Sequence, residues 1–139
     1  MIKSVRVVNF KSLAAVSIPL GHFTCLVGMN GAGKSTVLQA LDFLSQLMLG
    51  DVQGWLDRRG WSAADLKCKL RRESNITFNV TFKPSTGGSL TWIGVFNRSD
   101  LRCSQEDAYL GASESAGFLL RSSGQAFHLE GKPSQSIAF

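Results

Sequence analysis

The pattern of apolar and polar positions divides this chain into strands and one long helix. Residues 75–83 alternate strictly between the two classes, which predicts a strand with one buried face and one wet face. Residues 84–88 have turn composition and residues 89–96 are again strand-like, so residues 75–96 predict a β-hairpin. The alternating apolar positions of the first strand are Ile76, Phe78, Val80 and Phe82.

The N-terminal part of the chain predicts three more strands. Residues 2–9 and 14–20 are rich in β-branched side chains and are separated by a short polar break. Residues 23–27 read Phe-Thr-Cys-Leu-Val, an almost unbroken apolar run that is typical of a strand buried on both faces. On this interpretation Cys25 is a small buried hydrophobic residue.

Helical periodicity begins at Lys34 and ends at Gly50, which is a natural helix stop. Residues 51–70 predict two short helices with a break at Gly60, and Ser62 and Asp65 have the spacing of a capping box. Short strand-like runs then predict an antiparallel meander. These runs are residues 101–104, 117–122, 125–130 and 134–139.

Composition bounds the class of protein. The chain has 139 residues, 44% hydrophobic and 18% charged, which suits one packed domain or lobe and excludes a disordered tail. No stretch reaches the length of a membrane span, and no apolar export segment follows Met1, so the expected address is the cytoplasm and no membrane is expected as a partner. The spacing of Cys25, Cys68 and Cys103 predicts neither a disulfide framework nor a zinc site.

The net charge of +5 comes from one segment, residues 58–72, which holds six basic residues and a single acid, Asp65. Such a segment either contacts phosphate or an acidic partner, or is simply a solvated surface. No known nucleic-acid motif accompanies these charges, which favours the solvated surface. The basic residues are Arg58, Arg59, Lys67, Lys69, Arg71 and Arg72.

One motif carries chemistry. Residues 28–35 read Gly-Met-Asn-Gly-Ala-Gly-Lys-Ser and match the phosphate-binding loop G-x-x-x-x-G-K-[ST], or Walker A, between a predicted strand and a predicted helix. Glycines let the backbone wrap a polyphosphate, and backbone N–H groups at a helix start attract anions. The predicted nucleotide-binding residues are Asn30, Gly31, Ala32, Gly33, Lys34, Ser35 and Thr36.

Three of these residues have distinct expected roles. Lys34 would place its charge between the β- and γ-phosphates, and the Ser35 hydroxyl is a suitable oxygen ligand for Mg²⁺. Thr36, in the first helical turn, can donate to the α-phosphate. The sequence therefore predicts ATP and Mg²⁺ as the bound cofactors, with Ser35 on the metal.

This loop, with Asn30 in it and two strands before it, resembles the N-terminus of ABC-type ATPases of the RecF, SMC and OLD group, which are also called AAA ATPases. The resemblance is strong over residues 1–50 and architectural over residues 51–139. It implies an α/β fold, the N-terminal lobe of a P-loop NTPase with a mixed sheet and an antiparallel β extension. The lobe would combine strands, loop and helix (1–50), short basic helices (51–72) and a meander (75–139).

The resemblance also implies a function. Members of this group bind ATP and Mg²⁺, form head-to-tail dimers around two nucleotides, and act on DNA ends, gaps and chromosomes in DNA repair, or with nucleases in phage defence. In these relatives the loop after the first strand lies near the nucleotide. Lys11 and Ser12 are therefore candidates for contacts to the base or the phosphates, and the alternative is a plain β-turn.

Parts needed for hydrolysis are missing from the sequence. Hydrolysis needs a carboxylate on Mg²⁺ and a group that positions water, which this group supplies from an apolar strand ending in Asp-Glu. No such pattern occurs here, and residues 113–117 resemble the signature loop only superficially. We expect an N-terminal lobe or truncated product that hardly hydrolyses ATP by itself. The resemblance also implies a glutamine that senses the γ-phosphate, for which Gln105 and Gln125 are the two candidates.

Two alternatives stay open at this point. A small-molecule kinase would need paired lid arginines, for which Arg71 and Arg72 are the nearest candidates, and a vestigial remnant would use the basic segment to contact a partner. His22 and His128 lack neighbouring catalytic groups in the sequence and are interpreted as structural. Three tryptophans could stack on a base but more often pack a core or an interface: Trp55, Trp61 and Trp92.

Overall fold

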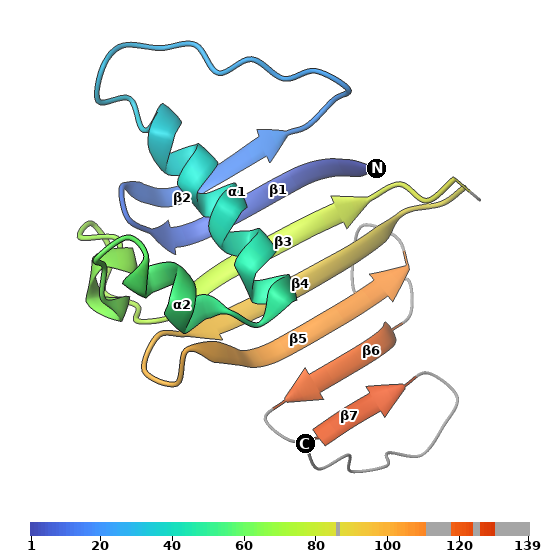
Figure 1. Ribbon diagram of the computed structural model, residues 1–139. Coiled ribbons are helices and arrows are strands. Elements are labelled where there is room, and N and C mark those ends of the chain that lie inside the picture. The colour runs from blue at the N-terminus through green and yellow to red at the C-terminus, as the bar shows by residue number, and fades with distance from the viewer. Residues whose placement is uncertain (86, 111–117, 124–125, 130–139) are drawn as a thin grey trace.

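The computed structural model describes residues 1–85, 87–110, 118–123 and 126–129. Within these residues the strands form one seven-stranded sheet in the order β2-β1-β3-β4-β5-β6-β7, and each adjacent pair is antiparallel (Figure 1). The strands are β1 (Ile2–Phe10), β2 (Leu13–Pro19), β3 (Ile76–Phe82), β4 (Leu90–Asn97), β5 (Arg102–Leu110), β6 (Phe118–Ser123) and β7 (Ala126–Leu129).

Two helices cover one face of the sheet near its N-terminal strands (Figure 1). Helix α1 (Lys34–Leu49) crosses that face, and α2 (Val52–Asp57) and the short 3-10 helix η1 (Ala63–Leu66) follow it. The chain then returns to the sheet at β3, which pairs with β1 on the side opposite β2. The β1–β2 turn therefore lies beside segments that come much later in the chain.

Most of the local predictions are confirmed. The strands expected at residues 2–9 and 14–20 are β1 and β2, and the hairpin expected at residues 75–96 is β3–β4, with Val80 opposite Trp92. Helix α1 ends as predicted at Gly50, whose φ is 79° and whose N–H bonds to the carbonyl of Gln46. No helix among the described residues has the length and hydropathy to cross a membrane.

The meander is antiparallel as predicted, but its first strand is longer than expected. Strand β5 continues to Leu110 through a polar stretch that the sequence analysis did not assign to a strand. That stretch fits because Asp107 is buried and accepts hydrogen bonds from Arg121 of β6 and from Gln105. The strand expected at residues 134–139 lies outside the described residues.

The prediction of a buried strand at residues 23–27 is wrong. This segment runs outside the sheet, with Phe23 exposed by 87% and Val27 by 89%, and Cys25 is exposed rather than buried. An apolar run becomes a strand only when another strand satisfies its backbone groups. The described strands pair only in antiparallel fashion among themselves, so the parallel pair that a mixed sheet requires is not present in this sheet.

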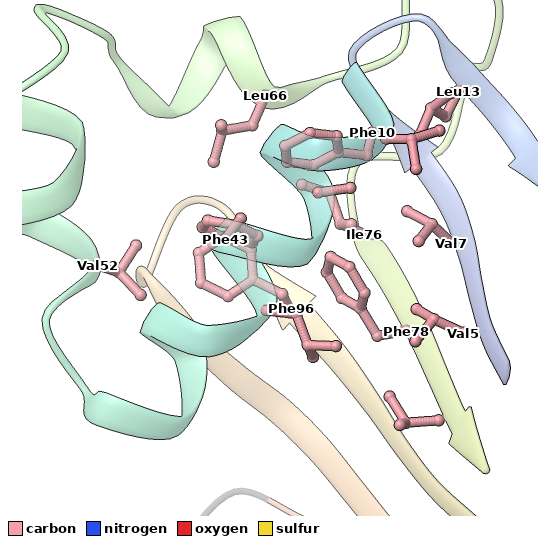
Figure 2. Packing of buried hydrophobic residues seen from close by; sticks show 14 of the residues in the cluster. Val5, Val7, Phe10, Leu13, Phe43, Val52, Leu66, Ile76, Phe78 and Phe96 are labelled. Atoms are coloured by element: carbon pink, nitrogen blue, oxygen red, sulfur yellow. The ribbon is translucent and has the colours of Figure 1, made fainter. Parts of the chain in front are cut away.

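An aromatic cluster fixes α1 to the sheet, and Figure 2 labels Phe10, Phe43, Phe78 and Phe96 of this cluster. The fully buried ring of Phe43 has its centroid 5.1–6.0 Å from four other aromatic rings. These separations are in the favourable range for aromatic pairs. The four rings come from β1, α2, β3 and β4 and belong to Phe10, Trp55, Phe78 and Phe96.

We expect Phe43→Ala to lower the free energy of unfolding by about 3–5 kcal/mol, because it leaves a cavity between the helix and the sheet. Leu38→Ala is the matched control on the same helix. Leu38 is 61% exposed, so its truncation should change the free energy by less than about 0.5 kcal/mol. Urea denaturation followed by circular dichroism measures both, and equal losses would contradict this account of the core.

Candidate functional site

The loop before α1 turns into the helix through two glycines with positive φ. Gly31 has a φ of 83° and Gly33 a φ of 86°, whereas Gly28 is not among the positive-φ residues. Gly33 is the N-cap of α1, and no side chain caps this helix start. A Cβ at Gly33 would meet only ordinary contacts, so the left-handed dihedral, rather than lack of space, is what favours glycine there.

A cavity of about 270 Å³ opens at this helix start. The first N–H groups of an α-helix have no acceptors within the helix, and the helix dipole places partial positive charge there. Together with the ammonium of Lys34, these groups make the cavity suitable for an anion. Its lining residues are Ser12, Asn30, Gly31, Gly33, Lys34, Ser35 and Thr36, so of the predicted loop residues only Ala32 does not line it.

The side chain of Lys34 folds back over the loop. Its Nζ donates to the carbonyl oxygens of Gly28 and Met29, each at 2.7 Å. Both carbonyls belong to the exposed entry of the loop, and neither is a charged partner. The ammonium is therefore held at the cavity by two neutral acceptors, which an anionic ligand could replace with stronger, charge-assisted bonds.

Ser12 connects the β1–β2 turn to the helix start. Its Oγ donates to Oγ1 of Thr36 at 3.0 Å. The two residues that the sequence analysis selected from this turn thus have different positions. Ser12 lines the 270 Å³ cavity and also a second cavity, whereas Lys11 lines only the second.

This second cavity has a volume of about 580 Å³ and combines aromatic, apolar and charged walls. The Nζ of Lys11 lies 3.2 Å from the centroid of the Trp61 ring, a cation–π contact. Burial lowers the pKa of Lys11, with a further lowering from Arg59 and an opposing effect of Asp65. The lining residues are Lys11, Ser12, Trp61, Ala64, Asp65, Lys67, Lys69 and Leu70.

Asn9 ties the walls of the second cavity together. It is fully buried at the end of β1 and has a positive φ of 66°, which asparagine tolerates better than most residues. Its Nδ2 donates to the carbonyls of Glu73 and Asn75, each at 2.7 Å, and its Oδ1 accepts from the N–H of Cys68 at 3.2 Å. One side chain therefore holds the segment after η1 against β1.

Two further contacts order the same region. The backbone N–H of Lys11 donates to the carbonyl of Leu66 at 2.8 Å. The predicted capping box is confirmed, since the Asp65 carboxylate accepts from both the N–H and the hydroxyl of Ser62. These bonds from Ser62, with smaller effects of Lys11 and Lys69, hold the pKa of Asp65 below its usual value, so Asp65 is ionised at neutral pH.

The structure separates the basic segment into paired and unpaired charges. Three arginines form local salt bridges: Arg58 with Asp51, Arg59 with Asp42, and Arg71 with Glu73. Hydrogen bonding to Arg71 lowers the pKa of Glu73 to about 2. Lys67 and Lys69 form no salt bridge within the described part of the chain, and both line the second cavity.

Sequence reasoning left the tryptophans open and missed the two lysines as site residues. Trp55 packs in the core, as expected, whereas Trp61 contacts Trp55 edge to face at 5.5 Å and also lines the second cavity. The excess of positive charge in residues 58–72 was the signal that could have identified Lys67 and Lys69 as site residues. Gln105 bonds to Asp107 in β5 and lines neither cavity.

Metal-binding groups are few in this part of the fold. The described residues contain no cluster of three or more histidine, cysteine or acidic side chains that could hold a metal. The hydroxyl of Ser35 lines the smaller cavity and is the side-chain oxygen predicted for Mg²⁺. Gln125 lies outside the described residues, as does the segment 113–117.

We expect Asn9→Leu to lower the free energy of unfolding by about 2–4 kcal/mol, because it leaves two carbonyls and one N–H without their partner. Asn79→Leu is the control, since Asn79 lies half-buried on β3 and should change stability by less than about 1 kcal/mol. Thermal denaturation measures both. An Asn9→Leu protein as stable as the wild type would contradict the anchoring role.

Comparison with known proteins identifies relatives of this chain. The family model described as "AAA ATPase domain" matches residues 1–90. The chain is 38% identical over 109 residues to the OLD nuclease of Thermus scotoductus, covering 78% of this chain and 19% of that protein. It is 48% identical over 46 residues to the DNA replication and repair protein RecF of Porphyromonas gingivalis, covering 32% of this chain and 13% of that protein.

A shorter match is to the ferric enterobactin transport ATP-binding protein FepC of Escherichia coli. It is 52% identical over 42 residues, covering 30% of this chain and 15% of that protein. This chain therefore spans less than a fifth of the length of each of these three relatives.

Proposed function

We propose that this chain binds Mg-ATP at the start of α1. The chain belongs to the AAA ATPase domain family and is related to the RecF and OLD group of ABC-type ATPases, which supports this proposal. One observation carries the proposal. The contiguous loop–helix motif surrounds a 270 Å³ cavity that combines an uncapped helix N-terminus, two left-handed glycines and the Lys34 ammonium. This combination matches the charge and shape of a polyphosphate.

Different groups of this chain contact different parts of Mg-ATP in this proposal. The backbone N–H groups of the loop and first helical turn hold the phosphate oxygens. Lys34 exchanges its two carbonyl partners for the β- and γ-phosphates, and Thr36 donates to the α-phosphate. Ser35 supplies one oxygen ligand, which fits Mg²⁺ because that ion usually takes its remaining ligands from phosphate and water. When bound, Mg²⁺ neutralises charge on the phosphates.

Lys34→Ala should weaken the binding of Mg-ATP by about 2–4 kcal/mol, because it removes a charge-assisted contact to phosphate. Lys3→Ala is the matched control, since it removes the same charge from the opposite end of β1. Isothermal titration calorimetry on the 139-residue chain measures both. Equal affinities in the wild type and Lys34→Ala would favour a vestigial nucleotide site.

We further propose that the chain is the N-terminal lobe of a larger ATPase. The exposed run at residues 23–27 has the composition of a strand without a partner, and the OLD nuclease and RecF relatives are more than five times longer than the matched part. Their names, a nuclease and a DNA replication and repair protein, support action on DNA in repair, with a nuclease or DNA as partner. Phage defence is the alternative that the resemblance to the OLD group implies. A head-to-tail dimer and a cytoplasmic location complete this proposal.

We expect no ATP hydrolysis by this chain above the background rate. The described residues that line the smaller cavity include no carboxylate, so none of them can act as the carboxylate near Mg²⁺ or as the base that positions the attacking water. A phosphate-release assay measures this, with Lys34→Ala as the baseline. Turnover that disappears in Lys34→Ala would contradict the expectation.

The kinase alternative gains no support from the arginine pair that it required. Arg71 is engaged by Glu73, and neither Arg71 nor Arg72 lines either cavity. The charges that remain next to the nucleotide loop are lysines of the second cavity.

A further inference from the structure

The exposed run that leads from β2 into the phosphate loop is held to the fold only at its two ends (Figure 1). Residues 21–29 form no helix or strand, and every one of them is exposed to solvent. Before the run, the N–H of Leu20 donates to a carbonyl of β1 at 2.8 Å. At its end, Nζ of Lys34 donates to the carbonyls of Gly28 and Met29, each at 2.7 Å. Within the described part of the chain, these two bonds are the hydrogen bonds that join the run to α1.

We propose that Lys34 is a tether under ligand control, which holds residues 21–28 to α1 and releases them when a polyphosphate takes its ammonium. This inference rests on the proposed Mg-ATP binding and adds a conformational change in a segment that does not contact the ligand. The helix end of the tether is rigid, because the packing of Phe43 fixes α1 against the sheet. The exposed run is therefore the part that moves.

The number of donors on Lys34 makes the loop and the ligand compete. An ammonium has three N–H groups, and two hydrogen bonds to the loop carbonyls use two of them. A polyphosphate that takes one N–H for each of two phosphate groups leaves one N–H for the two carbonyls. At least one bond of the tether therefore breaks when both phosphates bind. The exchange favours the ligand, because bonds to phosphate oxygens join two charged groups and bonds to carbonyls do not.

The two carbonyls differ in what else holds them. The Met29 carbonyl also accepts from the N–H of Ala32 at 3.2 Å, which closes a turn inside the loop. For the Gly28 carbonyl, the described residues supply no donor other than Lys34. Loss of the tether therefore frees the chain up to Gly28 and leaves the turn intact. The cost is small, because Gly28 is exposed and water can satisfy its carbonyl.

Release couples the phosphate site to an apolar segment. Phe23 and Val27 are among the most exposed large hydrophobic side chains of the described residues, and both lie in the part of the run that the tether controls. Occupancy of the phosphate site thus determines how freely these side chains move. Because coupling between two sites is reciprocal, any contact that draws the run away from Lys34 would also favour binding of the polyphosphate.

A lid that closes over the ligand is the competing device, and it predicts the opposite motion. A lid needs side chains that reach the ligand, whereas none of residues 21–29 lines the 270 Å³ cavity. The run also contains no lysine or arginine that could attract a phosphate group. These observations favour release of the run over closure.

A spin label on Cys25 measures the motion of the run. Cys25 is exposed, whereas Cys68 is fully buried and burial raises the pKa of the Cys103 thiol to about 12, so a nitroxide reagent reacts selectively with Cys25. Addition of Mg-ATP, or of tripolyphosphate with Mg²⁺, should shorten the rotational correlation time of the nitroxide about two-fold in its EPR spectrum. An unchanged or longer correlation time in a chain that binds these ligands would overturn the proposal.

Lys34→Met isolates the tether, because it keeps most of the aliphatic stem and removes the donors. Its Cys25 label should be as mobile without ligand as the wild-type label is with ligand, and neither ligand should change it further. A label as immobile as in the wild type would show that Lys34 does not hold the run. Thermal melting verifies that the variant folds.

A matched label position tests whether the response is local. Ser99→Cys in a Cys25→Ser background carries the label at an exposed turn outside both cavities, where the ligands should leave its mobility unchanged. A response at Ser99 as large as that at Cys25 would contradict a local release.

Calorimetry with the same two ligands separates this proposal from the proposed function. If both ligands bind to the wild type and the Cys25 label does not respond, the release is wrong and the phosphate site stands. If neither ligand binds to the wild type, the proposed function fails and the release fails with it.

Discussion

The site depends on how the turn between β1 and β2 is held. Asn9 and Lys11 both have positive φ in this turn, so the backbone adopts a conformation that local preference disfavours. The three hydrogen bonds of the buried Asn9 side chain and the Lys11–Leu66 backbone bond stabilise it. Because the turn is fixed, Ser12 borders both cavities and Lys11 reaches Trp61.

The core positions the other half of the site. Phe43 packs against rings from four different elements, and this contact fixes the axis of α1 and therefore its first turn, which carries Ser35 and Thr36. The glycine loop then needs only its two left-handed residues to enter the helix. Rigid elements on both sides thus present a loop that is itself exposed to solvent and open to a ligand.

The sequence predicted what depends on neighbours in the chain. The alternation of apolar and polar residues predicted the β3–β4 hairpin, and the helical period of the apolar residues predicted α1. The spacing of Ser62 and Asp65 predicted their capping box. The second cavity could not be predicted, because the residues that Asn9 joins are 59 to 66 positions away from it. The prediction of a buried strand at residues 23–27 failed for the same reason, because an apolar pattern does not show whether another strand pairs with the segment.

The most direct test of the central claim is an amide-resolved NMR titration of the ¹⁵N-labelled chain with Mg-ATP. The account predicts shift changes at the backbone amides of Gly31 to Thr36 and at Ser12, which line the smaller cavity or its loop. A titration that leaves the loop amides unchanged would contradict the account as a whole.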